Sequence, residues 1–147
     1  MTIRKQMIGY ILIILFLLFI FPSLYDSHIG HPQWGPINHS PAAATQATIT
    51  KAAGGAGTRH YVTSILACFT GTAVSAPLRI VLRDGASGVG PIVWSARIGI
   101  VSANGGDCIP MTTHFRMSIN TAVTLEFIAA GAVGTNEEVT LAGFTEG

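Results

Sequence analysis

Alternation of apolar and polar side chains constrains the fold of this chain most. From Ala47 onward, short segments with period-two alternation are separated by glycine-rich turns. In the clearest of them, residues 111–119, Met111, Phe115 and Met117 share one side of the pattern, while His114 and Arg116 share the other. No window has amphipathic helical spacing, so residues 47–147 are predicted to fold as an all-β, antiparallel, jelly-roll-like β-sandwich.

The positions of the cysteines and a tryptophan help to choose between sandwich types. An immunoglobulin domain places its tryptophan between two cysteines of core strands. Trp94 does lie between Cys68 and Cys108, but the segment Gly-Gly-Asp-Cys-Ile-Pro around Cys108 is typical of a loop. The jelly-roll-like arrangement is therefore favoured.

The two cysteines also bear on the compartment of the domain. They permit one disulfide, Cys68 to Cys108, in an exported domain, but they form no CxxC pair and lack metal-ligand spacing. Buried, reduced thiols are the favoured alternative, because free cysteine behaves as a small apolar core residue.

An uncharged apolar segment occupies residues 7–24, directly after Arg4 and Lys5. As a helix it spans roughly 27 Å, just under the ~30 Å of a hydrocarbon core. Basic residues on its amino-terminal side alone predict export of the remainder, and the lack of a small-residue cleavage site favours a retained transmembrane anchor over a signal peptide. The anchor residues that we predict are Met7, Tyr10, Leu12, Leu15, Phe16, Phe19 and Phe21.

Residues 25–46 contain Pro32, Pro36 and Pro41 and show no alternation. Proline spacing of this kind predicts an extended, partly polyproline-like linker. The expected organisation is therefore a hydrophobic helix in residues 1–24, a linker in 25–46 and the sandwich in 47–147.

The sequence shows no pattern typical of catalysis, and we expect no enzyme and no cofactor. His28, His31 and His39 are potential metal ligands, but a proline-broken segment does not fix their geometry, so no metal is predicted. Glu137 and Glu138 are adjacent and would point to opposite faces of a strand, which suits a charged sheet edge better than a catalytic pair.

The charge pattern limits the partners of the domain. A net charge of +1 with 10% charged residues is too low and too balanced for a nucleic-acid surface. The alternation points Arg79, Arg83, Arg97 and Arg116 outward, where a stripe of arginines would suit an acidic glycan or a partner protein. An ordinary solvated sheet face is the alternative.

Several segments follow one another along the chain in a characteristic order: ITKAAGGAGTRH at 49–60, VLRDGASGVG at 81–90 with IVW at 92–94, NTAVTLEF at 120–127 and VTLAGF at 139–144. In this order they resemble a group of small head-, tail- or fibre-associated structural proteins of tailed bacteriophages and prophages. The resemblance implies a β-sandwich that assembles into the virion as a homo-oligomer, with no enzymatic role. The apolar amino-terminal segment departs from that group.

The sequence is therefore compatible with two functions. The first is a non-enzymatic virion protein (decoration, spike, fibre or tail-associated) that contacts other virion proteins and is anchored in a membrane or a hydrophobic protein sheath. Its oligomer would bury an apolar face with Tyr61, Ile65 and Phe69. The alternative is a membrane-anchored module of the bacterial envelope, exposed outside, that recognises glycan or protein through loops at residues 84–90 and 103–108.

Overall fold

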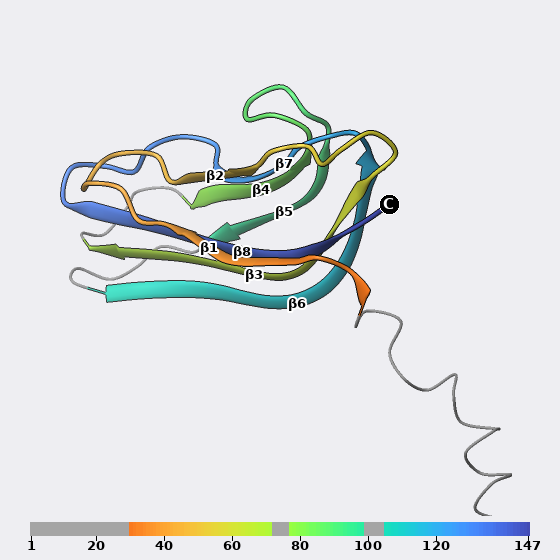
Figure 1. Cartoon of the computed structure of the whole chain (residues 1–147). Helices are drawn as coiled ribbons and strands as arrows, with labels where there is room; N and C mark the ends of the chain where they lie inside the picture. The colour runs from red at the N-terminus through yellow and green to blue at the C-terminus, as the bar shows by residue number, and fades with distance from the viewer. Residues whose placement is uncertain (1–29, 72–76, 99–104) are drawn as a thin grey trace, which may run out of the picture. The chain divides into compact units, whose positions relative to one another are not determined.

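The computed structural model of the chain describes residues 30–71, 77–98 and 105–147. These residues form two stacked antiparallel β-sheets of four strands each (Figure 1), which confirms the predicted all-β sandwich. The strands are β1 (Gln33–His39), β2 (Thr48–Lys51), β3 (Arg59–Gly71), β4 (Leu78–Asp84), β5 (Ile92–Ile98), β6 (Gly105–Ile119), β7 (Val123–Phe127) and β8 (Thr135–Glu146).

The strand order is regular. Sheet A has the order β1-β8-β3-β6, and sheet B has the order β2-β7-β4-β5. The first strand therefore pairs with the last, the second with the seventh, the third with the sixth, and the fourth with the fifth. This is the pairing of one long hairpin whose tip is the β4–β5 connection and whose arms are wound so that successive pairs fall in opposite sheets.

The core lies between the two sheets and is built from every second residue of the strands. Phe69 of β3, Leu82 of β4, Phe127 of β7 and Leu141 of β8 are fully buried there. Each such side chain contributes about 1.5–3 kcal/mol by leaving water. The predicted alternation in β6 is confirmed from Met111 to Met117, which is buried between exposed neighbours, but it ends there, because Ile119 is 48% exposed.

The predicted linker is wrong over residues 33–39, which form strand β1 at the edge of sheet A. Trp34 packs into the core, and the unit that contains the sandwich begins at Pro32. Pro36 is tolerated because an edge strand needs no donor on its free side, and the pairing is interrupted between Trp34 and Ile37. Gly35 is required there, because its φ is +87° and a Cβ would lie 2.7 Å from the Leu141 carbonyl oxygen.

The predicted apolar face of β3 is also wrong. Ile65 and Phe69 point into the core, whereas Tyr61 lies on the opposite side of the sheet. The reason is a register shift between Val62 and Ser64, where an extra residue reverses the alternation along the strand. An oligomer contact cannot therefore use Tyr61, Ile65 and Phe69 as one surface.

Cys68 and Cys108 face each other across β3 and β6 and form a disulfide. The favoured alternative of buried, reduced thiols is wrong, because Ala67 and Phe69 fill the core and Cys68 points to the outer side of sheet A. Cys108 is exposed and belongs to a strand, so the loop assignment that counted against an immunoglobulin arrangement no longer holds.

The predicted membrane anchor, with all seven of its named residues, lies in residues 1–29, outside the described part of the chain. Among the residues that are described, no helix is both long enough and apolar enough to cross a membrane. The anchor therefore stays a prediction from the sequence.

Candidate functional site

The four predicted surface arginines do not form one stripe. Arg79 and Arg83 lie on β4 and Arg97 on β5, all in sheet B, whereas Arg116 lies on β6 in sheet A. Within sheet B, Arg79 and Arg97 are directly opposite each other in the register of β4 and β5. The structure therefore brings together one pair of the four.

Arg83 has a structural role. Its Nε donates to Oε1 of Glu126 at 2.5 Å, and its Nη1 donates to the carbonyl oxygen of Gly90 at 2.9 Å. The side chain of Arg83 is 14% exposed and that of Glu126 is 2% exposed, so the ion pair is largely removed from water. Arg83 is therefore not available to a partner.

Glu126 also holds the β4–β5 connection, which Figure 1 shows on the outer side of sheet B. The Ser87 hydroxyl donates to Oε2, and the Gly88 amide donates to Oε1 at 3.2 Å. Burial alone raises the pKa of Glu126, but the hydrogen bonds from Ser87, Arg83 and Gly88 outweigh it, so the pKa lies below its usual range. Val81, the register partner of Glu126, is fully buried on this face as well.

The base of the same connection is held by Asp84. Its carboxylate accepts from the Ser118 amide at 2.9 Å and from the Thr121 hydroxyl at 2.7 Å, and both donors belong to the end of β6 and the turn that follows. Thr124 donates to the carbonyl oxygen of Gly85 at 2.8 Å. The base of this connection is thus fixed to the domain, whereas residues 86–89 at its tip are exposed, with Val89 at 85%.

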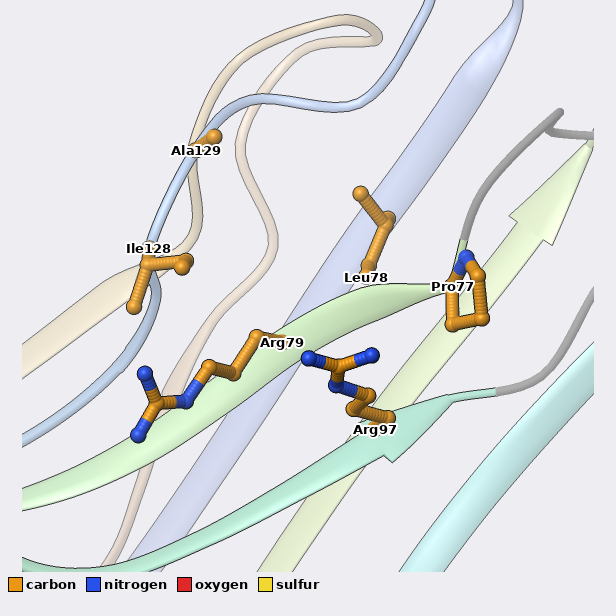
Figure 2. Close-up of a pocket in the computed structure, with 6 residues that line it drawn as sticks. All are labelled: Pro77, Leu78, Arg79, Arg97, Ile128 and Ala129. Atoms are coloured by element: carbon orange, nitrogen blue, oxygen red, sulfur yellow. The ribbon is translucent and has the colours of Figure 1, made fainter.

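The other end of β4 carries a hollow of about 360 Å³ at the surface of sheet B (Figure 2). Arg79 and Arg97 both line it, with the Arg79 guanidinium extending toward the side of Ile128 and the Arg97 guanidinium toward Leu78 and Pro77 (Figure 2), and the remaining walls are aliphatic. Ile128, which directly follows β7, is 47% exposed and extends the apolar wall toward solvent. The hollow is lined by Pro77, Leu78, Arg79, Arg97, Ile128 and Ala129.

The charge of this hollow is not neutralised within the described part of the chain. Arg79 Nη2 donates to the Ser95 hydroxyl at 3.4 Å, and Arg97 makes no hydrogen bond or ion pair with any described residue. Like charges directly opposite each other on neighbouring strands repel, and guanidinium groups do not lose their proton in proteins. The pair therefore favours an anion that accepts hydrogen bonds from both side chains.

The adjacent glutamates of β8 are both structural. Glu137 is buried, and its Oε2 accepts from the Ala47 amide at 2.8 Å. Burial raises its pKa, and the amides of Ala47 and Gly131 offset this only in part. Glu138 points outward and accepts from Asn38 at 2.7 Å. The predicted charged edge is wrong, because β8 lies between β1 and β3.

The histidines of the sandwich have structural partners too. His39 Nδ1 accepts from the Thr48 amide at 3.0 Å. Buried His60 has Nε2 2.8 Å from the Ala52 carbonyl oxygen and Nδ1 2.9 Å from the Thr145 hydroxyl, so Nε2 carries the proton that the carbonyl accepts. Within residues 30–71, 77–98 and 105–147, no three His, Cys, Asp or Glu side chains lie close enough to hold a metal ion. His28 lies outside this part.

Sequence reasoning identified Arg79 and Arg97 but missed what surrounds them. Ile128 lies just beyond the alternating residues of β7, so no pattern marks it as part of a surface hollow. The ion pair of Arg83 was missed because Glu126 lies 43 residues later. The signal that was present is the charge alternation of β7, which puts Glu126 on the same outer face as the arginines.

Comparison with known proteins does not assign the chain to a family. A scan against models of protein families finds none that matches, and a search of curated proteins finds no match.

Proposed function

We propose that the protein is a non-enzymatic structural component of a bacteriophage particle, displayed outside its membrane or protein sheath by the hydrophobic segment at residues 7–24. The observation that carries this proposal is the strand order of the two sheets, β1-β8-β3-β6 and β2-β7-β4-β5. Winding an eight-strand hairpin produces this order, and we interpret the domain as a jelly roll. Jelly rolls build many viral capsid proteins.

The disulfide supports a domain outside the cytosol. Cys68 and Cys108 bond on the outer side of sheet A, where Cys108 is exposed. Exposed disulfides persist in oxidising compartments and on virion or cell surfaces, whereas cytosolic reductants keep such thiols reduced. This agrees with export of the domain, which the basic residues before the apolar segment predict.

Two buried carboxylates of the sandwich have structural partners. Glu126 is satisfied by Arg83 and the hairpin tip, and the Glu137 carboxylate holds the amide of Ala47. Each of these carboxylates ties one segment of the sandwich to another. Neither reaches the hollow lined by Arg79 and Arg97.

The rival function, an envelope module that recognises glycan or protein through its loops, has less support. The connection at residues 84–90 is anchored through Glu126 and Asp84, which restrains its exposed residues, and residues 105–108 of the second loop belong to β6. Aromatic side chains, on which sugar rings stack, are absent from the hollow of sheet B. Contacts with other virion proteins and with further copies of the chain are the partners that we propose.

Purified particles test this proposal. Mass spectrometry of gradient-purified virions is expected to detect the chain at a fixed ratio to the major capsid protein. Cryo-electron microscopy of the same particles is expected to show its sandwich at a repeated position. Detection of the chain only in host membranes, with particles free of it, would overturn the proposal in favour of the envelope protein.

A further inference from the structure

We propose that the hollow lined by Arg79 and Arg97 binds the carboxylate of an acidic peptide segment in a partner protein, with an aliphatic residue of that segment packed against Ile128. This inference goes beyond the proposed function, and it holds equally for a particle protein and for an envelope protein. Particle purification and peptide binding therefore fail independently of each other.

The charges of Arg79 and Arg97 are not balanced within the described part of the chain. Arg79 and Arg97 are register partners, and no carboxylate among the described residues pairs with either of them. Four residues along the same strand, Arg83 does have a carboxylate, from Glu126. A carboxylate placed between two guanidinium groups accepts hydrogen bonds from both and removes their repulsion. Binding therefore supplies the counter-charge that the isolated domain lacks.

The walls of the hollow are aliphatic. Apart from the two arginines, the lining side chains are those of Pro77, Leu78, Ile128 and Ala129. Sugar hydroxyls need donors and acceptors, and sugar rings need an aromatic platform, and these walls offer neither. An acidic side chain flanked by an aliphatic residue matches both the charged and the apolar part of the hollow.

The hollow carries only two positive charges, those of Arg79 and Arg97. A nucleic-acid surface requires many phosphate contacts, whereas two guanidinium groups on a chain of net charge +1 supply few. Two arginines suit a single carboxylate, which the fork of each guanidinium can grip with two hydrogen bonds. Exposure of 47% leaves Ile128 accessible to the neighbouring residue of the partner.

The test uses the full chain in detergent and an array of blocked pentapeptides with Leu-Glu-Leu or Leu-Asp-Leu at their centre. Matched peptides carry Gln or Asn in place of the acid. Acidic peptides are expected to bind at least about tenfold more tightly than their amide counterparts, which corresponds to about 1.4 kcal/mol. Binding is expected to weaken as salt is added.

Variants locate the site. Arg97→Ser is expected to reduce acidic-peptide binding by about tenfold or more, and Arg116→Ser, an exposed arginine of sheet A, is the matched control that leaves it unchanged. An unchanged melting temperature shows that Arg97→Ser is folded. Equal binding of acidic and amide peptides, loss of binding in both variants, no binding anywhere on the array, or tighter binding of a glucuronic-acid oligosaccharide would each overturn the inference.

Discussion

Two arginines of β4 point to the same face of sheet B and have opposite surroundings. Arg83 is largely buried, paired with Glu126 and bonded to Gly90, whereas Arg79 borders an open hollow and faces the like charge of Arg97. The first arginine holds the domain together, because its charge is balanced inside the chain. The second is a surface feature that the fold does not need. The presence or absence of a counter-charge, more than the residue type, separates structural from available arginines on this face.

The largest effect is expected when the ion pair between Arg83 and Glu126 is removed. Glu126→Ala removes the acceptor of Arg83, Ser87 and Gly88 and leaves a poorly exposed guanidinium unpaired. The free energy of unfolding should fall by about 3 kcal/mol, and the melting temperature by on the order of 10 °C. Thermal denaturation followed by circular dichroism measures this. Glu138→Ala, which removes one exposed hydrogen bond to Asn38, is the control and should change stability by less than about 0.5 kcal/mol.

A smaller loss of stability is expected when the β4–β5 connection is displaced by a substitution that changes no charged residue. In Gly90→Ala, the new Cβ would lie 2.7 Å from the Gly85 Cα and 2.9 Å from the Asp84 carbonyl oxygen. Both contacts are with backbone atoms, so the variant should lose about 1–3 kcal/mol. Gly55→Ala, where a Cβ meets nothing within 4 Å, is the control. Equal stability of the two variants would show that the tip is not packed against its own base.

Of the two ends of β4, acid should destabilise only the one at which Arg83 pairs with Glu126. The pKa of Glu126 is lowered on folding, so its stabilisation is complete above the ordinary value of 4.5 and is lost as the pH falls through the folded value. The pKa of Glu137 is raised, so its cost is absent below 4.5 and grows as the pH rises toward its folded value. Melting temperatures between about pH 3 and 7 should therefore lose their acid-side decline in Glu126→Gln. In Glu137→Gln, the melting temperature near neutral pH should rise, because the variant has no buried carboxylate to ionise. A pH profile that is unaltered in both variants would contradict these roles of Glu126 and Glu137.

The smallest effect is expected when Arg79 is given a carboxylate partner on β5. Arg97→Glu places a carboxylate opposite Arg79 in the register of β4 and β5. Replacing a repulsive cross-strand pair with an attractive one should stabilise the domain by about 0.5 kcal/mol at low salt. The gain should fade at about 1 M salt, where the screening length is short. A loss of stability would mean that Arg79 is already balanced.

The alternation of the sequence predicted the sandwich where the strands are regular. In β6, Thr113, Phe115 and Met117 lie on the inner side and His114 and Arg116 on the outer side, as the period-two pattern requires. Arg79 and Arg97 were placed outward for the same reason. Their meeting in one hollow follows from the pairing of β4 with β5, which the turn residues Asp84 and Gly85 indicated.

The sequence could not predict what depends on a single shifted residue or on a distant partner. Near Thr63, β3 has one residue more than the neighbouring strand β8, which reverses the alternation in β3, and nothing in the residue types marks that position. Pro36 suggested a linker, because proline is tolerated in a strand only at the edge of a sheet. That β1 is an edge strand follows from the order of the whole sheet, which the local sequence does not show. Glu126 could be assigned to the hairpin tip only once β4 and β7 were known to be neighbours.

The pairing of β1 with β8 has a consequence for how the chain reaches this structure during synthesis. Asn38 contacts Glu138, 100 residues later, so the edge strand of sheet A is made early and waits for its neighbour until almost the whole sandwich has been translated. β8 also lies between β1 and β3, and without it sheet A has a gap at its centre. Contacts of such long range form slowly, because the intervening chain must first be ordered. The domain therefore completes its fold after the ribosome has released β8, and a chain cut short before Thr135 would expose unpaired strand edges that promote aggregation.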